Sequence, residues 1–143
     1  MTSRDAIIYL INQYSFTIDG GDLEGFACLF EHGEWRIEGV HDFLGKQEVL
    51  DYLQANVKIY EDGTPRTRHL TTNVDLVIDE SSGKASSQCY VTVMQQTDDF
   101  PLQAIFTGHY VDAFEYTQGQ WHFVTRTVKS PLMGDMSRHV KLS

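Results

Sequence analysis

The sequence predicts an α+β domain in which helices come first and antiparallel strands make up most of the rest. Apolar residues recur at helical spacing in three stretches of the first half of the chain. Four stretches typical of strands, separated by turn signals, fill the second half. Helices followed by a run of strands favour an α+β fold over a parallel α/β fold. The 143 residues fit one domain, residues 1–143, which can bury a core without disulfides.

The first predicted helix runs from about Ser3, its N-cap, to Asp19. The glycines at 20 and 21 end it, because glycine accepts the left-handed backbone conformation of a helix C-cap. Asp22 then caps a short second helix over about residues 23–30. The apolar stripe of the first helix consists of Ile7, Ile11, Tyr14 and Ile18.

The predicted strands must bury one face against these helices. A first strand over residues 34–38 precedes a loop that contains Gly39, His41 and Gly45, and a third helix over about residues 46–57. The long strands follow, the last three at about residues 85–96, 101–116 and 121–128. In the first of them, alternation puts Leu70, Thr72, Val74, Leu76 and Ile78 on one face and His69, Thr71, Asn73 and Asp75 on the other. A twisted sheet closed on one side by helices leaves a cone whose interior is either packed or holds a ligand.

Composition excludes several classes of function. The net charge of −9 argues against nucleic acid as a partner, because phosphate binding needs clustered Lys and Arg. The N-terminus has no apolar signal segment and no run reaches the length of a membrane span, so we expect a cytoplasmic protein without a membrane partner. Cys28 and Cys89 lack metal or redox spacing, and we expect two buried thiols.

The sequence contains no motif for a metal or a cofactor. The six histidines do not occur at ligand spacings such as H-x-x-x-H. There is also no glycine-rich phosphate loop, nucleophile elbow or dinucleotide-binding fingerprint. We therefore expect chemistry that needs neither a metal nor a cofactor.

Several stretches resemble one known family in order and over nearly the whole chain. They are Ile18-Asp19-Gly20-Gly21-Asp22 with Phe30, Glu34 to Gly39, Arg68 to Asn73, Gly108 to Asp112 with Phe114, and Trp121-His122-Phe123 with Arg126. On these residues the chain resembles the SnoaL-like branch of the nuclear-transport-factor-2-like superfamily. The resemblance implies a cystatin-like cone, in which N-terminal helices pack on a strongly curved antiparallel or mixed sheet that encloses a pocket. It also implies a homodimer or homotrimer.

Within that superfamily the chain is most similar to the lyases scytalone dehydratase, hexachlorocyclohexane dehydrochlorinase and bile-acid 7α-dehydratase. In these enzymes an aspartate at the end of the first helix pairs with a histidine at the start of a strand, and the matching residues here are Asp19 and His69. The resemblance also places Tyr14 and Arg126 among the catalytic residues. An apolar residue near Val93 replaces a further acidic residue of the bile-acid enzyme, which argues against the same substrate.

The leading hypothesis is a cofactor-independent lyase or isomerase acting on a hydrophobic cyclic small molecule. A histidine can take and return a proton at neutral pH, and a buried carboxylate fixes its tautomer and stabilises its charged form. Asp19 would thus orient His69 for proton abstraction, followed by elimination, isomerisation or cyclisation. Tyr14 would hydrogen-bond a substrate oxygen, and Arg126 would need a charged partner if it pointed inwards.

Further residues are candidates for the lining of the pocket. Asn73 shares a strand face with His69 and Thr71, and His109 shares one with Thr107 and Val111. His122 is expected to point inwards with Arg126 by alternation. The candidate substrate-binding residues are Trp35, Asn73, Tyr90, Met94, Phe106, His109, Tyr110 and Phe123.

Two other functions remain open from the sequence. One is a non-catalytic small-molecule-binding or accessory subunit, similar to the small subunits of ring-hydroxylating dioxygenases, which would need no inward dyad. The other resembles an epoxide hydrolase, in which Asp19, Arg126 and Asp112 would activate water. A pair of Asp19 and His69 within hydrogen-bond distance beside an open cavity would favour the lyase or isomerase.

Overall fold

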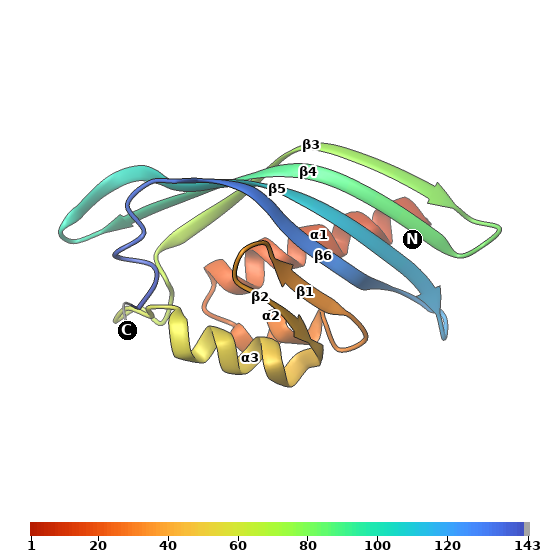
Figure 1. Ribbon diagram of the computed structural model, residues 1–143, viewed down its shortest axis with the longest axis horizontal. Coiled ribbons are helices and arrows are strands. Elements are labelled where there is room, and N and C mark those ends of the chain that lie inside the picture. The colour runs from red at the N-terminus through yellow and green to blue at the C-terminus, as the bar shows by residue number, and fades with distance from the viewer. Residues whose placement is uncertain (142–143) are drawn as a thin grey trace.

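The four long strands of a curved six-stranded sheet arch over three helices in the computed structural model, which describes residues 1–141 (Figure 1). The elements follow the order α1 (Ser3–Asp19), α2 (Leu23–Cys28), β1 (Glu34–Ile37), β2 (His41–Leu44), α3 (Gly45–Asn56), β3 (Thr67–Asp79), β4 (Lys84–Thr97), β5 (Phe100–Thr117) and β6 (Gln120–Met133). The strand order is β2-β1-β6-β5-β4-β3; β1 runs parallel to β6 and the other pairs are antiparallel. The predicted cystatin-like α+β architecture is confirmed; the sheet stays open and does not close into a barrel.

The end of α1 is fixed by glycine, as the sequence predicts. Gly21 has a φ of 78°, and a Cβ there would lie 1.9 Å from the carbonyl oxygen of Gly63. Any other residue would clash as well as strain the backbone, so the chain must turn here. The start differs from the prediction, because Thr2 and not Ser3 is the N-cap; its hydroxyl accepts from the Asp5 amide. The helix therefore holds Asp19 at its last turn, beneath the start of β3.

The alternation in β3 is interrupted, which corrects the predicted faces. The register with β4 shifts between Thr72 and Asp75, and Asn73 has a φ of 58°. Before this bulge Thr67, His69 and Thr71 point toward the helices, and after it the even-numbered Val74, Leu76 and Ile78 do so. Leu70 is instead 47% exposed on the outer face. A bulge adds one residue to a strand and so exchanges its two faces.

Two smaller predictions were wrong. The stretch predicted as a loop around His41 forms the edge strand β2, which pairs with β1 through Trp35–Phe43 and its neighbours. Cys89 is buried as expected, but Cys28 is exposed on the outer side of α2. Among the described residues, no helix is both long and apolar enough to cross a bilayer.

Candidate active site

An apolar cavity of about 350 Å³ lies between the concave face of the sheet, the three helices and the segment that follows β6. Its wall includes Tyr14, His69 and three of the predicted lining residues, Trp35, Phe106 and Tyr110. Two larger hollows, of about 700 and 630 Å³, contain neither Asp19 nor His69. A cavity of this size and polarity suits a small, mostly hydrophobic ligand.

Asp19 and His69 meet at this cavity and form a dyad. The Oδ1 atom of Asp19 lies 2.6 Å from Nδ1 of His69, and Oδ2 accepts the backbone amide of His69 at 2.7 Å. The hydroxyl of Thr67 also donates to Oδ1, at 2.7 Å. His69 lines the cavity and Asp19 lies behind it, so Nδ1 faces the carboxylate and Nε2 is the ring nitrogen that a ligand can reach.

The surroundings of Asp19 keep its carboxylate ionised. Burial alone would raise its pKa, but the hydrogen bonds and charge of His69 and the bond from Thr67 outweigh it. The pKa of Asp19 is therefore lower than its ordinary value of 3.8. An ionised carboxylate on Nδ1 selects one tautomer of His69 and stabilises the imidazolium once a proton is taken up on Nε2.

Tyr14 reaches the cavity from the buried face of α1. Its side chain is 3% exposed, and its ring lies 5.2 Å from that of Tyr110 and 6.4 Å from that of His69. Burial raises the pKa of Tyr14 despite the neighbouring charge of Arg126. Its hydroxyl is therefore protonated at neutral pH and can serve as a hydrogen-bond donor.

Arg126 does not line the cavity, contrary to its predicted place among the catalytic residues. Its side chain is fully buried and forms two hydrogen bonds with the carboxylate of Asp112, at 2.8 and 2.9 Å. Its guanidinium carbon lies 4.1 Å from the ring centre of Tyr110 and 4.4 Å from that of Tyr14. Burial lowers the pKa of Arg126, but Asp112 outweighs this effect and the pKa rises above its ordinary value. Arg126 thus supports the two tyrosines from behind. Asp112 is buried in its ion pair with Arg126, and neither residue lines the cavity. The described cavity wall therefore lacks the Asp-Arg-Asp set that the epoxide-hydrolase hypothesis requires.

Five predicted lining residues and His122 lie elsewhere. In β4 the odd-numbered residues point inwards, so Tyr90 and Met94 belong to the outer face, and Tyr90 is 54% exposed. His109 is beside Tyr90 on that face, with Nε2 2.9 Å from the amide oxygen of Gln88. Asn73 is exposed at the β3 bulge. Phe123 lies in the core, where its ring stacks on that of Phe30. The ring of His122 contacts the ring of His32. Bulges in β3 and between Ala113 and Phe114 of the β5–β6 pair upset simple counting along these strands.

His139 is a residue of the cavity wall that the sequence did not reveal. It is 9% exposed, and its ring centre lies 6.4 Å from that of His69. Two buried nitrogen atoms of wall residues, Nδ1 of His139 and Nε1 of Trp35, have no hydrogen-bond partner. Burial and the charge of His69 lower the pKa of His139 to about 4, so its ring is neutral at pH 7. Among the described residues, no three potential metal ligands cluster.

Comparison with known proteins identifies related chains. The sequence model of the SnoaL-like domain matches residues 1–127. No curated protein gives a significant match.

Solved structures share the fold. A variant of Rv3472, a protein of unknown function from Mycobacterium tuberculosis, is 25% identical with a TM-score of 0.73, and the alignment covers 88% of this chain and 70% of that one. An NTF2-like protein with a cystatin-like fold from Novosphingobium aromaticivorans is 18% identical (TM-score 0.72; 87% and 79% covered). A proposed scytalone dehydratase from the same species is 20% identical (TM-score 0.69; 92% and 87% covered).

Proposed function

This chain belongs to the SnoaL-like family, and we propose that it is a cofactor-independent lyase or isomerase that acts on a hydrophobic cyclic small molecule. The observation that carries the proposal is the Asp19–His69 pair, 2.6 Å apart, at the wall of a mostly apolar cavity. A binding or accessory protein has no need of a histidine that is oriented by a buried carboxylate and open to a ligand. The geometry therefore supports catalysis over that alternative.

The reaction begins with removal of a proton from a substrate C–H group by Nε2 of His69. The C–H electron pair moves into the substrate, and Asp19 stabilises the imidazolium that forms. In an elimination the pair expels a hydroxyl group from the neighbouring carbon, and Nε2–H protonates that oxygen to release water. In an isomerisation the same proton returns to a different carbon. Tyr14, protonated at neutral pH, donates a hydrogen bond to a substrate oxygen.

The remaining side chains of the site determine where the substrate lies. Trp35, Phe106 and Tyr110 offer aromatic and apolar surface to rings and exclude water. Glu38 is the one acidic side chain of the described cavity wall, and it stands on the turn after β1. A neutral ring system fits this wall better than an anion does.

The test uses 2-tetralone, a bicyclic ketone whose α-protons exchange with solvent, in D₂O. We expect the protein to accelerate exchange, measured by proton NMR, and His69→Ala to lower the catalysed rate by about 10²–10⁴-fold. The His32→Ala variant is the matched control, because its side chain is 55% exposed. Full activity in a folded His69→Ala protein would overturn the proposal.

A further inference from the structure

We propose that His139, which the segment after β6 carries to the cavity, contacts the substrate and donates a hydrogen bond to the oxygen that gains negative charge when His69 removes a proton. The proposal rests on the function proposed above and assigns a substrate group to it. The family match ends at residue 127, so His139 lies outside the matched part of the chain.

The position of His139 indicates a contact with a ligand. Its ring and that of His69 share one cavity, with their planes inclined by 67°. The buried Nδ1 atom has no partner within the protein. A buried polar group without a partner costs about 1–3 kcal/mol, so a side chain that served only packing would be better replaced by an apolar one. Because Nδ1 is closed off from the cavity, the nitrogen that meets a substrate oxygen is Nε2 of the same ring, and Nδ1 stays unprotonated behind it.

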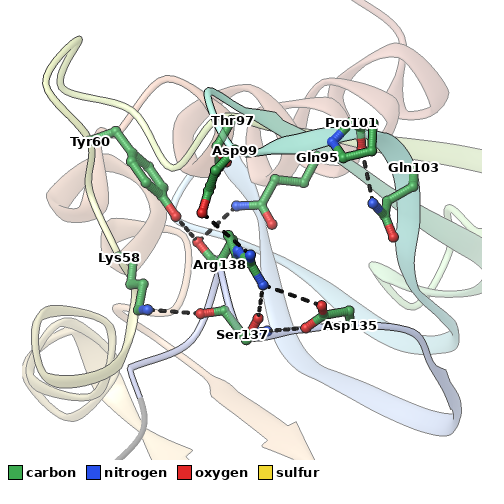
Figure 2. Close-up of polar contacts among 10 residues, drawn as sticks. All are labelled: Lys58, Tyr60, Gln95, Thr97, Asp99, Pro101, Gln103, Asp135, Ser137 and Arg138. Carbon is green, nitrogen blue, oxygen red and sulfur yellow. Dashed lines mark hydrogen bonds and ion pairs between the residues drawn. The ribbon is translucent and has the colours of Figure 1, made fainter.

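Hydrogen bonds hold the backbone just before His139 in place, and Figure 2 shows those to Ser137 and Arg138. The carbonyl oxygen of Arg138 accepts hydrogen bonds from the Tyr60 hydroxyl and from Nε2 of Gln95, the latter at 2.9 Å. Lys58 donates from Nζ to the carbonyl of Ser137 at 2.8 Å, and from its backbone amide to the carbonyl of His139 at 2.9 Å. Gln95 is itself 1% exposed. These bonds tie the segment to the chain before β3 and to β4, and so hold the backbone that carries His139 beside the cavity.

Side-chain contacts of Arg138 add to this anchoring. Its guanidinium lies 3.4 Å from the carboxylates of Asp99 and Asp135, and Nη1 donates to the hydroxyl of Ser137 at 2.8 Å (Figure 2). Arg138 points toward these groups, whereas His139, the next residue of the same turn, lines the cavity.

The protonation state of His139 suits a donor that never competes with His69 for the proton. Burial and the charge of His69 keep its pKa at about 4, against a smaller opposite effect of Asp19. A neutral imidazole retains one N–H donor and can stabilise an oxyanion without transferring the proton. When His69 becomes an imidazolium, a neutral neighbour also avoids repulsion between like charges.

A base at His69 and a hydrogen-bond donor at His139 together define a substrate class, a cyclic ketone with a C–H bond next to the carbonyl. The C–H bond breaks, its proton moves to Nε2 of His69, and its electron pair shifts so that the carbonyl oxygen becomes an enolate. His139 hydrogen-bonds this oxygen. The enolate then expels a β-hydroxyl, which takes the proton from His69 and leaves as water, or is reprotonated at another carbon.

The experiment compares the binding of two probes that differ by one oxygen, 2-tetralone and its hydrocarbon tetralin, by calorimetric titration. We expect the parent protein to prefer the ketone and His139→Phe to reduce that preference by about threefold to tenfold. His139→Gln keeps an N–H donor and should retain part of the preference. His32→Phe, the same exchange at an exposed histidine, should leave it unchanged.

The outcomes separate this inference from the proposed function. An equal loss of affinity for both probes in His139→Phe means that the residue only packs, and overturns the inference. An unchanged preference in His139→Phe, or no preference in the parent protein, overturns it as well. A preference that depends on His139 and persists in His69→Ala supports it, even if 2-tetralone shows no catalysed exchange.

Discussion

The protein contains two pairs of an aspartate with a cationic or basic side chain, and they differ in what lies next to them. Asp19 and His69 are nearly buried, with side-chain exposures of 12% and 9%, but His69 opens on the cavity. Asp112 and Arg126 are completely buried, and their remaining neighbours are aromatic rings and the hydroxyl of Ser87, which donates to Asp112 at 2.9 Å.

From this comparison we expect a buried pair to act in proton transfer only under two conditions. The base must change its protonation near neutral pH, which histidine does and arginine does not. One of its atoms must also face space that a ligand can enter. The Asp112–Arg126 pair meets neither condition and serves to position Tyr14 and Tyr110 at the cavity wall. Substitutions in the Asp19–His69 pair should therefore lower mainly the activity, and substitutions in the Asp112–Arg126 pair should lower mainly the stability.

The largest expected effect follows from Asp19→Asn. An amide cannot stabilise the imidazolium of His69 and offers no ionised acceptor for its Nδ1 proton, so we expect catalysed exchange of 2-tetralone to fall by about 10²–10⁴-fold. Proton NMR of the folded variant measures this rate, with circular dichroism to verify folding. A rate within a factor of three of the parent would show that His69 works without its carboxylate.

Arg126→Met should instead act on stability. It leaves the Asp112 carboxylate buried without a cation, and we expect a loss of about 3–5 kcal/mol in the free energy of unfolding, measured in urea. The double variant Arg126→Met, Asp112→Leu removes both charges and should recover most of that loss. Exchange activity of the double variant should stay close to that of the parent. A double variant that is stable but inactive would show that Arg126 is needed for activity, as the family resemblance implied.

The third prediction concerns acid pH and His139. A histidine whose folded-state pKa is about 4 and whose ordinary value is 6.5 takes up its proton earlier in the unfolded chain, so folding loses stability as pH falls between these values. The loss amounts to about 3 kcal/mol. His139→Gln should remove this part of the pH dependence in urea titrations from pH 7 to pH 4. Asp19, whose pKa is lower than its ordinary value of 3.8, adds its own loss mainly as pH falls below that ordinary value. Parallel curves for variant and parent would contradict the buried neutral state of His139.

The smallest effect is expected on the outer face of the sheet. His109→Gln changes a partly exposed side chain that contacts Gln88 and Tyr90. We expect a change within about 0.5 kcal/mol in stability and no change in exchange activity. A large loss of activity would mean that the outer face takes part in the reaction, for example through a second copy of the chain.

Most of the fold could be predicted because helix ends, turns and strand periodicity depend on residues that are close together in the chain. The glycines at 20 and 21 fixed the end of α1, and the boundaries of the predicted strands agreed to within a few residues except at the end of β6, while β2 was missed. Alternation failed where bulges occur, because one inserted residue exchanges the faces of everything beyond it. Nothing in the letters around Asn73 marks that insertion, which puts Leu70 on the opposite face from Val74, Leu76 and Ile78 although one shared face was expected.

The site was predictable only in part, for a different reason. Asp19 and His69 are 50 residues apart, and their pairing was expected from family resemblance rather than from spacing. Arg126 was correctly expected to need a partner if it pointed inwards, but sequence could not distinguish Asp112 from a substrate. His139 carries no local signal, because its role depends on how the chain after β6 returns across the cavity.

The end of β6 and the segment after it form part of the cavity wall but contain neither residue of the Asp19–His69 pair. In the proposed function the proton chemistry belongs to α1 and β3, whereas part of the cavity wall is formed beyond the family match, by Val128, Pro131, Met133, Met136, His139 and Val140. We therefore expect that exchanging the residues from 128 to 140 changes ligand preference while the Asp19–His69 pair stays intact. The same arrangement makes this stretch the natural place to graft or randomise when the scaffold is adapted to new ring systems.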